Sequence, residues 1–316
     1  MGIYTSEDKL MSLTDAMKLI KDGDSVAIGG GLILREPIAA IYELIRQKKR
    51  NLKLVGTAHG FDVDVACGGG IVGSDQHTYV GYEFVYRGGC PNFRRAVEEG
   101  KVDDKEDGCY AMIQGLRAAS YGIPFYPSTC YFGNDVIKYH PEYKEFNDPI
   151  TGQKLVAIPA IKPDVAILHV HKADKHGNVV TGTPLVADIL MARAAEKLIV
   201  TAEEIVTEDW FKERQAASIP YYETTAVVHV PYGAHPTCNY LAYTYDKPFL
   251  DEYIGYAQKG QEKMDEWLNK YVYDVSREEY LKRIGGPEKL KKLGEWRNRL
   301  TDATAFKKQL ETTWEV

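Results

Sequence analysis

The stretch from residue 22 to residue 37 constrains the fold most, because it has the order of a buried strand, a glycine turn and a helix start. Ser25–Ile28 is a short, largely apolar run that is typical of a buried strand. Three consecutive glycines follow it: Gly29, Gly30 and Gly31. Pro37 then opens a helical run at the first-turn position that proline favours. This order predicts an α/β protein, and the glycines indicate either an anion site or an ordinary tight turn.

Composition and charge narrow the expected partners and compartment. The formal net charge of −6 leaves no basic excess to neutralise phosphates, so we do not expect a nucleic-acid partner. The five cysteines are odd in number, widely spaced and free of C-x-x-C pairs, as is typical of reduced cytoplasmic thiols. The sequence shows no signal-peptide core and no apolar run of membrane-spanning length. We therefore expect a cytoplasmic protein without a membrane partner.

Strands alternate with helices along the chain, which predicts an open, mainly parallel sheet with helices on both faces. Val170–Val179 has the pattern of an antiparallel hairpin, so we expect a mixed sheet. Glu106–Tyr121 is predicted to be a helix, and residues 138–154 a surface excursion. The predicted organisation is an α/β domain over residues 1–250 and a charged, helical C-terminal extension over residues 251–316. That extension is expected either to pack on a neighbouring subunit or to form a solvated helical cap.

The stretch around the glycines resembles the signature of the alpha subunits of family I coenzyme A transferases. Four of its parts match that signature, namely Asp22-Gly23, the strand Ser25–Ile28, Gly29-Gly30 and Pro37. Two positions depart from it, because Gly31 stands where phenylalanine is usual and Arg35 where many members have glycine. The Arg35-x-Pro37 spacing resembles the glutaconate CoA-transferase branch.

Further landmarks of the same family follow in order to about residue 250. Gly233-Ala234-His235-Pro236 comes directly after a predicted strand, and loops at the carboxyl ends of parallel strands form ligand sites. Tyr245–Leu250 further resembles the glutaconate branch. The resemblance implies a NagB/RpiA/CoA transferase-like fold. It also places His235 at the substrate pocket, where we expect it to hold its loop by hydrogen bonds rather than to transfer protons.

The resemblance implies an enzyme that moves CoA between carboxylic acids. A glutamate carboxylate attacks the acyl-CoA thioester, and a glutamyl-CoA thioester forms. In the glutaconate branch this glutamate lies on the beta subunit, in a Ser-Glu-Asn/Thr-Gly context that is missing from this sequence. The chain therefore resembles the alpha subunit of a hetero-oligomer, with a beta subunit, acyl-CoA and a carboxylic acid as partners. Gly29, Gly30, Gly31 and Arg35 are then expected to form the oxyanion and substrate loop.

The acyl pocket is expected to differ from that of resembling alpha subunits. Those subunits place small polar residues against a dicarboxylate substrate, whereas this chain has bulkier residues in that segment: Tyr82, Glu83, Phe84 and Arg87. We expect an acid with a larger apolar body, and Arg35 or Arg87 as the partner of any second carboxylate. The other interpretation is that these rings only pack beneath a loop.

Two other activities remain open. A branch of hydrolases that opens rings of CoA-bound steroid fragments has a similar alpha chain, with a catalytic glutamate next to a glycine at a helix start. Here Asp107-Gly108 stands at that position and Glu106 precedes it. A sugar-phosphate isomerase or small-molecule sensor would use the glycines for phosphate, but its acid/base residues are missing. We expect no metal at three histidines that fit ordinary strand and turn positions: His169, His171 and His176.

Overall fold

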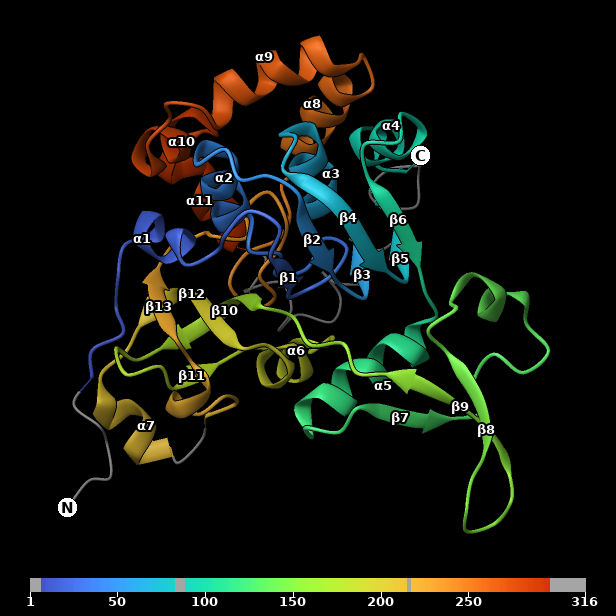
Figure 1. The fold of residues 1–316 in the computed structure, drawn as a ribbon. Coiled ribbons are helices and arrows are strands. Elements are labelled where there is room, and N and C mark those ends of the chain that lie inside the picture. The colour runs from blue at the N-terminus through green and yellow to red at the C-terminus, as the bar shows by residue number, and fades with distance from the viewer. Residues whose placement is uncertain (1–6, 83–88, 215–216, 296–316) are drawn as a thin grey trace, which may run out of the picture.

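The structure is a computed structural model that describes residues 7–82, 89–214 and 217–295. A parallel sheet forms its centre, with the strand order β13-β12-β10-β1-β2-β4-β6 (Figure 1). The short strand β11 pairs with the end of β10 in the antiparallel direction. The sheet is built from β1 (Ser25–Ile28), β2 (Leu52–Val55), β4 (Val72–His77), β6 (Asp103–Glu106), β10 (Val165–Ala173), β11 (Val179–Val180), β12 (Lys197–Ile205) and β13 (Ala226–His229). This mixed, mainly parallel sheet confirms the predicted fold class.

The order of the strands places a topological switch beside β1. The chain adds β2, β4 and β6 on one side of β1, and later adds β10, β12 and β13 on the other side. β1 and β10 pair in parallel, with Val26 opposite Val165. Ligands of open α/β sheets bind beyond the carboxyl ends of the strands at such a switch. The loop of residues 29–37 begins there, directly after β1.

Alternate residues of the central strands face two apolar cores. Val26 and Ile28 belong to the core that contains residues of α2 and α3, whereas Ala27 belongs to the core with residues of α5 and α6. These helices lie on opposite sides of the sheet (Figure 1). The helices are α1 (Leu13–Lys18), α2 (Ile38–Arg46), α3 (Phe61–Gly68), α4 (Pro91–Glu98), α5 (Cys109–Ser120), α6 (Asp188–Ala194), α7 (Glu208–Arg214), α8 (Lys247–Ala257), α9 (Gln261–Tyr271), α10 (Arg277–Arg283) and α11 (Gly286–Gly294). None of the helices within the described ranges is long and apolar enough to cross a membrane.

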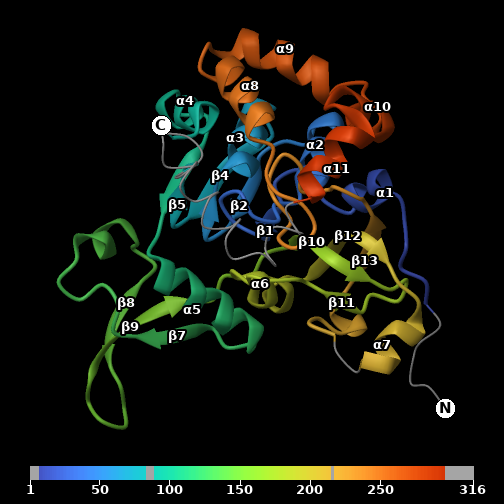
Figure 2. The same ribbon diagram turned by 180° about the vertical axis from the view of Figure 1, so that it is seen from behind.

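The C-terminal helices α8 to α11 form an additional layer over α2 and α3 (Figure 2). Trp267 of α9 is fully buried, and its ring centroid lies 6.1 Å from that of Tyr42 and 6.3 Å from that of Phe61. Aromatic side chains of this size contribute strongly to core burial. The described part of the extension thus packs on its own chain, and the division at residue 250 stays a prediction.

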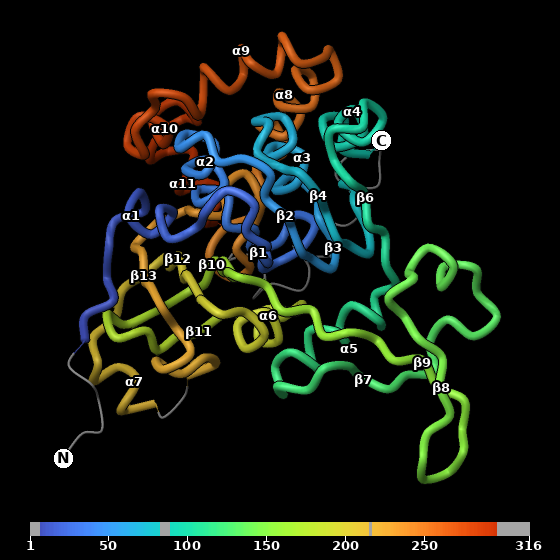
Figure 3. The backbone as a smooth tube through the Cα atoms, in the orientation of Figure 1, coloured from blue at the N-terminus to red at the C-terminus, as the bar shows by residue number. Residues whose placement is uncertain are grey.

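A second, smaller unit projects from the body of the molecule (Figure 3). It contains an antiparallel sheet with the order β7-β9-β8, formed by β7 (Phe125–Ser128), β8 (Lys144–Asn147) and β9 (Lys154–Pro159). It begins with α5, which also packs in the core of the main sheet through Met112 and Leu116. We call residues 109–161 the arm. The surface excursion expected over residues 138–154 belongs to this arm, and it contains the strand β8.

The predicted helix Glu106–Tyr121 begins too early. Glu106 is the last residue of β6, and α5 starts only at Cys109. Gly108 caps the helix with an extended backbone, at φ −81° and ψ 136°. Asp107 and Gly108 therefore form a turn between strand and helix, at the position where the hydrolase hypothesis needs a catalytic carboxylate.

Candidate active site

The glycine loop is a closed turn at the carboxyl end of β1. Gly30 has a φ of +80°, and a Cβ atom there would lie 2.2 Å from the carbonyl oxygen of Leu34. A Cβ atom on Gly29 would lie 2.3 Å from Leu168 of β10. Both positions therefore require glycine, the first for its backbone conformation and its close contact and the second for space alone.

Each of the three glycine amides already donates a hydrogen bond within the chain. Gly29 donates to the carbonyl of Ile167 at 2.9 Å, and Gly31 donates to the carbonyl of Leu34 at 2.9 Å. The Gly30 amide donates to the Asp188 carboxylate over a longer distance of 3.3 Å. To donate to an oxyanion, one of these amides must give up its present acceptor within the chain. The Gly30 bond is the longest and therefore the weakest of the three. The oxyanion role stays a prediction.

Arg35 leaves the loop and forms a buried ion pair with Asp188 at the start of α6. Its Nη1 lies 2.9 Å from Asp188 Oδ1 and its Nη2 lies 3.0 Å from Oδ2, and both side chains are fully buried. Nη2 also donates to the carbonyl of Pro184 at 2.7 Å. Burial alone would raise the pKa of Asp188, but the hydrogen bonds and charge of Arg35 outweigh it and lower that pKa. This geometry commits the guanidinium to Asp188, so it does not support the expected pairing of Arg35 with a substrate carboxylate.

His235 and Tyr82, two predicted pocket residues, are buried. The His235 ring lies 2.7 Å from the Tyr280 hydroxyl through Nδ1 and 2.9 Å from Asp246 through Nε2. Burial lowers the pKa of His235. Its contacts have the loop-holding geometry that we expected, and they join the loop after β13 to α8 and α10. The Tyr82 hydroxyl lies 3.3 Å from Asp64.

The other predicted pocket residues, Glu83, Phe84 and Arg87, lie outside the described residues.

Asp107 is a saturated carboxylate that joins the arm to the sheet. Its Oδ1 accepts from the Tyr131 hydroxyl and, at 2.7 Å, from the Gly108 amide. Its Oδ2 accepts from the Tyr143 hydroxyl at 2.5 Å and from Gln76 Nε2 at 3.4 Å. Burial raises the pKa of Tyr131 and Tyr143, so both hydroxyls stay protonated donors. With four donors around it, Asp107 has no free acceptor position for the proton of a substrate or water.

Glu106, the other residue of the hydrolase hypothesis, is exposed on the edge strand β6. Only its backbone carbonyl takes part in the cluster around Asp107, by accepting from His140 Nε2 at 3.0 Å.

A second carboxylate with four donors, that of Glu203, lies near the end of β12 beside His169 of β10. Glu203 Oε1 lies 2.6 Å from His169 Nε2, and it accepts from the Tyr243 hydroxyl at 2.5 Å and from Asn239 at 3.2 Å. Glu203 Oε2 accepts from the Tyr232 amide at 2.6 Å. Burial would raise the pKa of Glu203, but the charge and hydrogen bond of His169, together with the hydrogen bonds from Tyr243 and Tyr232, outweigh it and lower that pKa. Sequence reasoning missed this pair, although a histidine and a glutamate near the ends of consecutive predicted strands were a usable signal.

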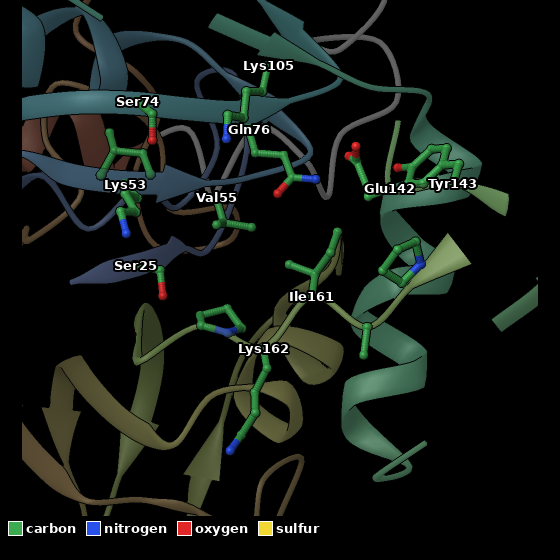
Figure 4. A pocket seen from close by; sticks show the side chains of 14 residues that line it. Ser25, Lys53, Val55, Ser74, Gln76, Lys105, Glu142, Tyr143, Ile161 and Lys162 are labelled. Carbon is green, nitrogen blue, oxygen red and sulfur yellow. The ribbon is translucent and has the colours of Figure 1, made fainter. Parts of the chain in front are cut away.

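A cavity of about 300 Å³ lies apart from the glycine loop, between the sheet and the arm. Lys53, Ser74 and Lys105 extend into it from β2, β4 and β6, and Ile161 lies opposite on the segment before β10 (Figure 4). Gln76 and Tyr143, which both hydrogen-bond to Asp107, line its other end. Both polar and apolar side chains line this cavity.

Comparison with known proteins places this geometry in a family. The sequence matches the Coenzyme A transferase family over residues 10–229. An uncharacterized protein of Archaeoglobus fulgidus is 40% identical over 90% of this chain, which spans 64% of that protein's length. The A-type subunit of glutaconate CoA-transferase from Acidaminococcus fermentans is 34% identical, over 88% of this chain and 92% of that subunit. The cholesterol ring-cleaving hydrolase IpdA subunit of Rhodococcus jostii is 31% identical, over 82% of this chain and 90% of that subunit.

The fold agrees with the sequence match. The crystal structure of glutaconate coenzyme A-transferase from Acidaminococcus fermentans superposes with a TM-score of 0.84 and 32% identity, over 90% of this chain and 95% of the matched chain. Both the sequence relationship and the sheet topology therefore confirm the predicted family. The chain belongs to the coenzyme A transferase family, as one of its alpha-type chains.

Proposed function

We propose that this chain is the non-nucleophilic subunit of a heteromeric CoA transferase whose beta-type partner carries the reacting glutamate. One observation carries the proposal beyond the family match. Two carboxylates near the carboxyl ends of the strands, Glu203 and Asp107, each accept hydrogen bonds from four donors of their own chain. A carboxylate held in this way is a poor nucleophile or base, so the reacting carboxylate is expected on the partner.

In the proposed reaction, the partner's glutamate attacks the carbonyl carbon of the acyl-CoA thioester. The CoA thiolate leaves and a mixed anhydride forms. The thiolate then attacks the glutamyl carbonyl, which releases the first acid as a carboxylate and leaves a glutamyl-CoA thioester. A second carboxylate reverses these two steps and departs as the new acyl-CoA. This chain is proposed to supply the acyl pocket and, through Gly29–Gly31, part of the support for the developing oxyanion.

The similarity to the ring-cleaving hydrolase subunit makes hydrolysis the competing activity. That activity needs a carboxylate with a free acceptor position at the start of α5. Asp107 has no such position, and Glu106 lies on the exposed edge strand. The geometry around Asp107 therefore supports transfer over hydrolysis.

We propose acyl-CoA and a free carboxylic acid as substrates, with no metal cofactor and a cytoplasmic location. Within residues 7–82, 89–214 and 217–295, no group of three or more histidine, cysteine or acidic side chains has the arrangement of a metal site. Because Arg35 is held by Asp188, the proposed partner for a second substrate carboxylate is Arg87. An acid with a larger apolar body than glutaconate remains the proposed preference.

The test is acyl exchange between CoA thioesters and free acids, measured for this chain with and without its beta-type partner. After incubation with acyl-CoA, borohydride reduction and peptide mass spectrometry should locate the reduced glutamyl thioester on the partner. Robust exchange by this chain alone, or a modified glutamate on this chain, would contradict the proposal. Thioester hydrolysis without exchange, lost in Asp107→Asn, would favour the hydrolase.

A further inference from the structure

A buried imidazole beside the glycine loop lies between two carboxylates. His59 of β3 (Ala58–His59) is 1% exposed. Its Nδ1 lies 2.5 Å from Asp62 Oδ2, and its Nε2 lies 3.2 Å from Asp75 Oδ1. The Nδ1 contact has hydrogen-bond geometry, whereas the Nε2 contact is an ion-pair distance without hydrogen-bond geometry. A doubly protonated, cationic ring is the charge that compensates two buried carboxylates at these distances. Burial would lower the pKa of His59, but the two carboxylates outweigh it and raise that pKa well above its usual range.

The carboxylates on both sides are buried and extend the network. Asp75 of β4 is fully buried, and its Oδ2 lies 3.0 Å from Nδ1 of His77. Asp62 at the start of α3 accepts from the Gly60 amide at 2.7 Å, and its own amide donates to Glu36 at 3.2 Å. Glu36 belongs to the loop that follows β1. Loss of the charge on His59 would leave Asp62 without this cation and Asp75 with His77 alone, which is costly in the interior.

The segment that carries His59 lies directly against the glycine loop. The Leu32 amide donates to the carbonyl of Ala58 at 3.0 Å. A Cβ atom on Gly60 would lie 2.3 Å from the Leu32 carbonyl oxygen, and one on Gly56 would lie 2.3 Å from the His59 ring. These contacts leave no free space between ring, segment and loop. A shift of the His59 ring must therefore move the backbone that holds Leu32.

We propose that His59 is a positioning residue for acyl transfer, which holds Ala58–Gly60 against Leu32 and thereby fixes the shape of the glycine loop. The protonated ring acts as a charged cross-link between the start of α3 and β4, and the loop rests on the segment between them. The reacting atoms are touched by the loop and not by His59. The kinetic part of this inference rests on the proposed transferase function.

The first test compares His59→Gln and Asp75→Asn with the wild-type chain, each assembled with the beta-type partner. Displacement of a positioned group by about 1 Å costs roughly 100-fold in rate, so kcat for acyl exchange should fall by about that factor in His59→Gln while KM for acyl-CoA stays unchanged. Hydrogen–deuterium exchange of a peptide covering residues 29–35 should be faster in both variants. His176→Gln is the matched control, because it also removes a contact between a buried histidine and a carboxylate, that of Glu208 at 2.6 Å, but at a site far from the loop in the sequence.

Wild-type kcat and wild-type exchange of residues 29–35 in an assembled His59→Gln complex would overturn the proposal. A second measurement needs no variant: the ¹⁵N shifts of the His59 ring in the wild-type chain should show both nitrogens protonated at pH 7.5, and a neutral ring would equally overturn it. If the wild-type complex exchanges no acyl groups, the proposed function fails. The exchange and ¹⁵N measurements still decide the role of His59 in that case.

Discussion

Replacement of Arg35 by methionine tests whether this residue is structural or binds substrate. The variant keeps a long side chain but leaves the Asp188 carboxylate fully buried without its cation. Removal of one partner from a buried ion pair costs about 3–5 kcal/mol, whereas an exposed pair contributes less than about 1 kcal/mol. The bidentate contact at 2.9 and 3.0 Å and the complete burial place Arg35 in the first class. We expect Arg35→Met to lower the free energy of unfolding by about 3–5 kcal/mol.

The double variant Arg35→Met/Asp188→Asn isolates the charge effect. The asparagine removes the unpaired charge, and its single oxygen can still accept from one of the two amides that contact different oxygens of Asp188, Gly30 at 3.3 Å or Val186 at 3.1 Å. We expect the double variant to recover a large part of the lost stability, measured by urea unfolding followed by circular dichroism. A loss below about 1 kcal/mol in Arg35→Met, together with a raised KM for the acid substrate, would refute the structural role and return Arg35 to the acyl pocket.

Three further predictions concern separate sites. Burial raises the pKa of Asp64 to about 6, from an ordinary value of 3.8. The protonated carboxyl therefore stabilises the fold fully below pH 3.8, and this stabilisation, about 3 kcal/mol, is lost as the pH rises through 6. Urea titrations at pH 4 and pH 7 should show that this difference is reduced in Asp64→Asn, and an unchanged difference would show that Asp64 is not its source. Asp107→Asn should speed limited proteolysis of the arm, because the Asp107 carboxylate anchors Tyr131 and Tyr143. Acyl exchange should persist in this variant. Complete loss of activity with an intact arm would favour the hydrolase. Gly30→Ala should slow acyl transfer strongly, since loss of an oxyanion donor costs about 3–4 kcal/mol. Gly122→Ala is the control, because Gly122 has a similar φ of +69° but no atom within 4 Å of an added Cβ, and this variant should transfer at the wild-type rate. Equal rates in the two variants would exclude a special role for the loop.

Local patterns in the sequence predicted the parts of the fold that depend on nearby residues. Ser12 and Asp15 have the spacing of a capping box, and Ser12 caps α1 by accepting from the Asp15 amide. The hairpin after Val170 occurs as β10 and β11, with Lys172 opposite Val180. β6 was missed for a physical reason, because all four of its residues are exposed and charged. It joins the sheet edge through its backbone, in register with Ser74–His77, and a strand of this kind has no alternation of polar and apolar residues to detect.

The candidate site was harder to predict because its decisive contacts join distant segments. Arg35 and Asp188 are separated by 153 positions, and Glu203 meets Tyr243 across 40. An arginine two residues before Pro37, in a stretch that resembles the glutaconate branch, suggested a substrate contact because arginine pairs well with carboxylates. The three-dimensional arrangement of the parallel strands determines which residues pair, because their register places residues from separate βα units on one edge of the sheet. Buried charges at that edge are stable only when they are paired. At the carboxyl edge of this chain, Arg35 thus pairs with Asp188 and His169 with Glu203, and the proposed transferase takes its reacting carboxylate from the partner chain.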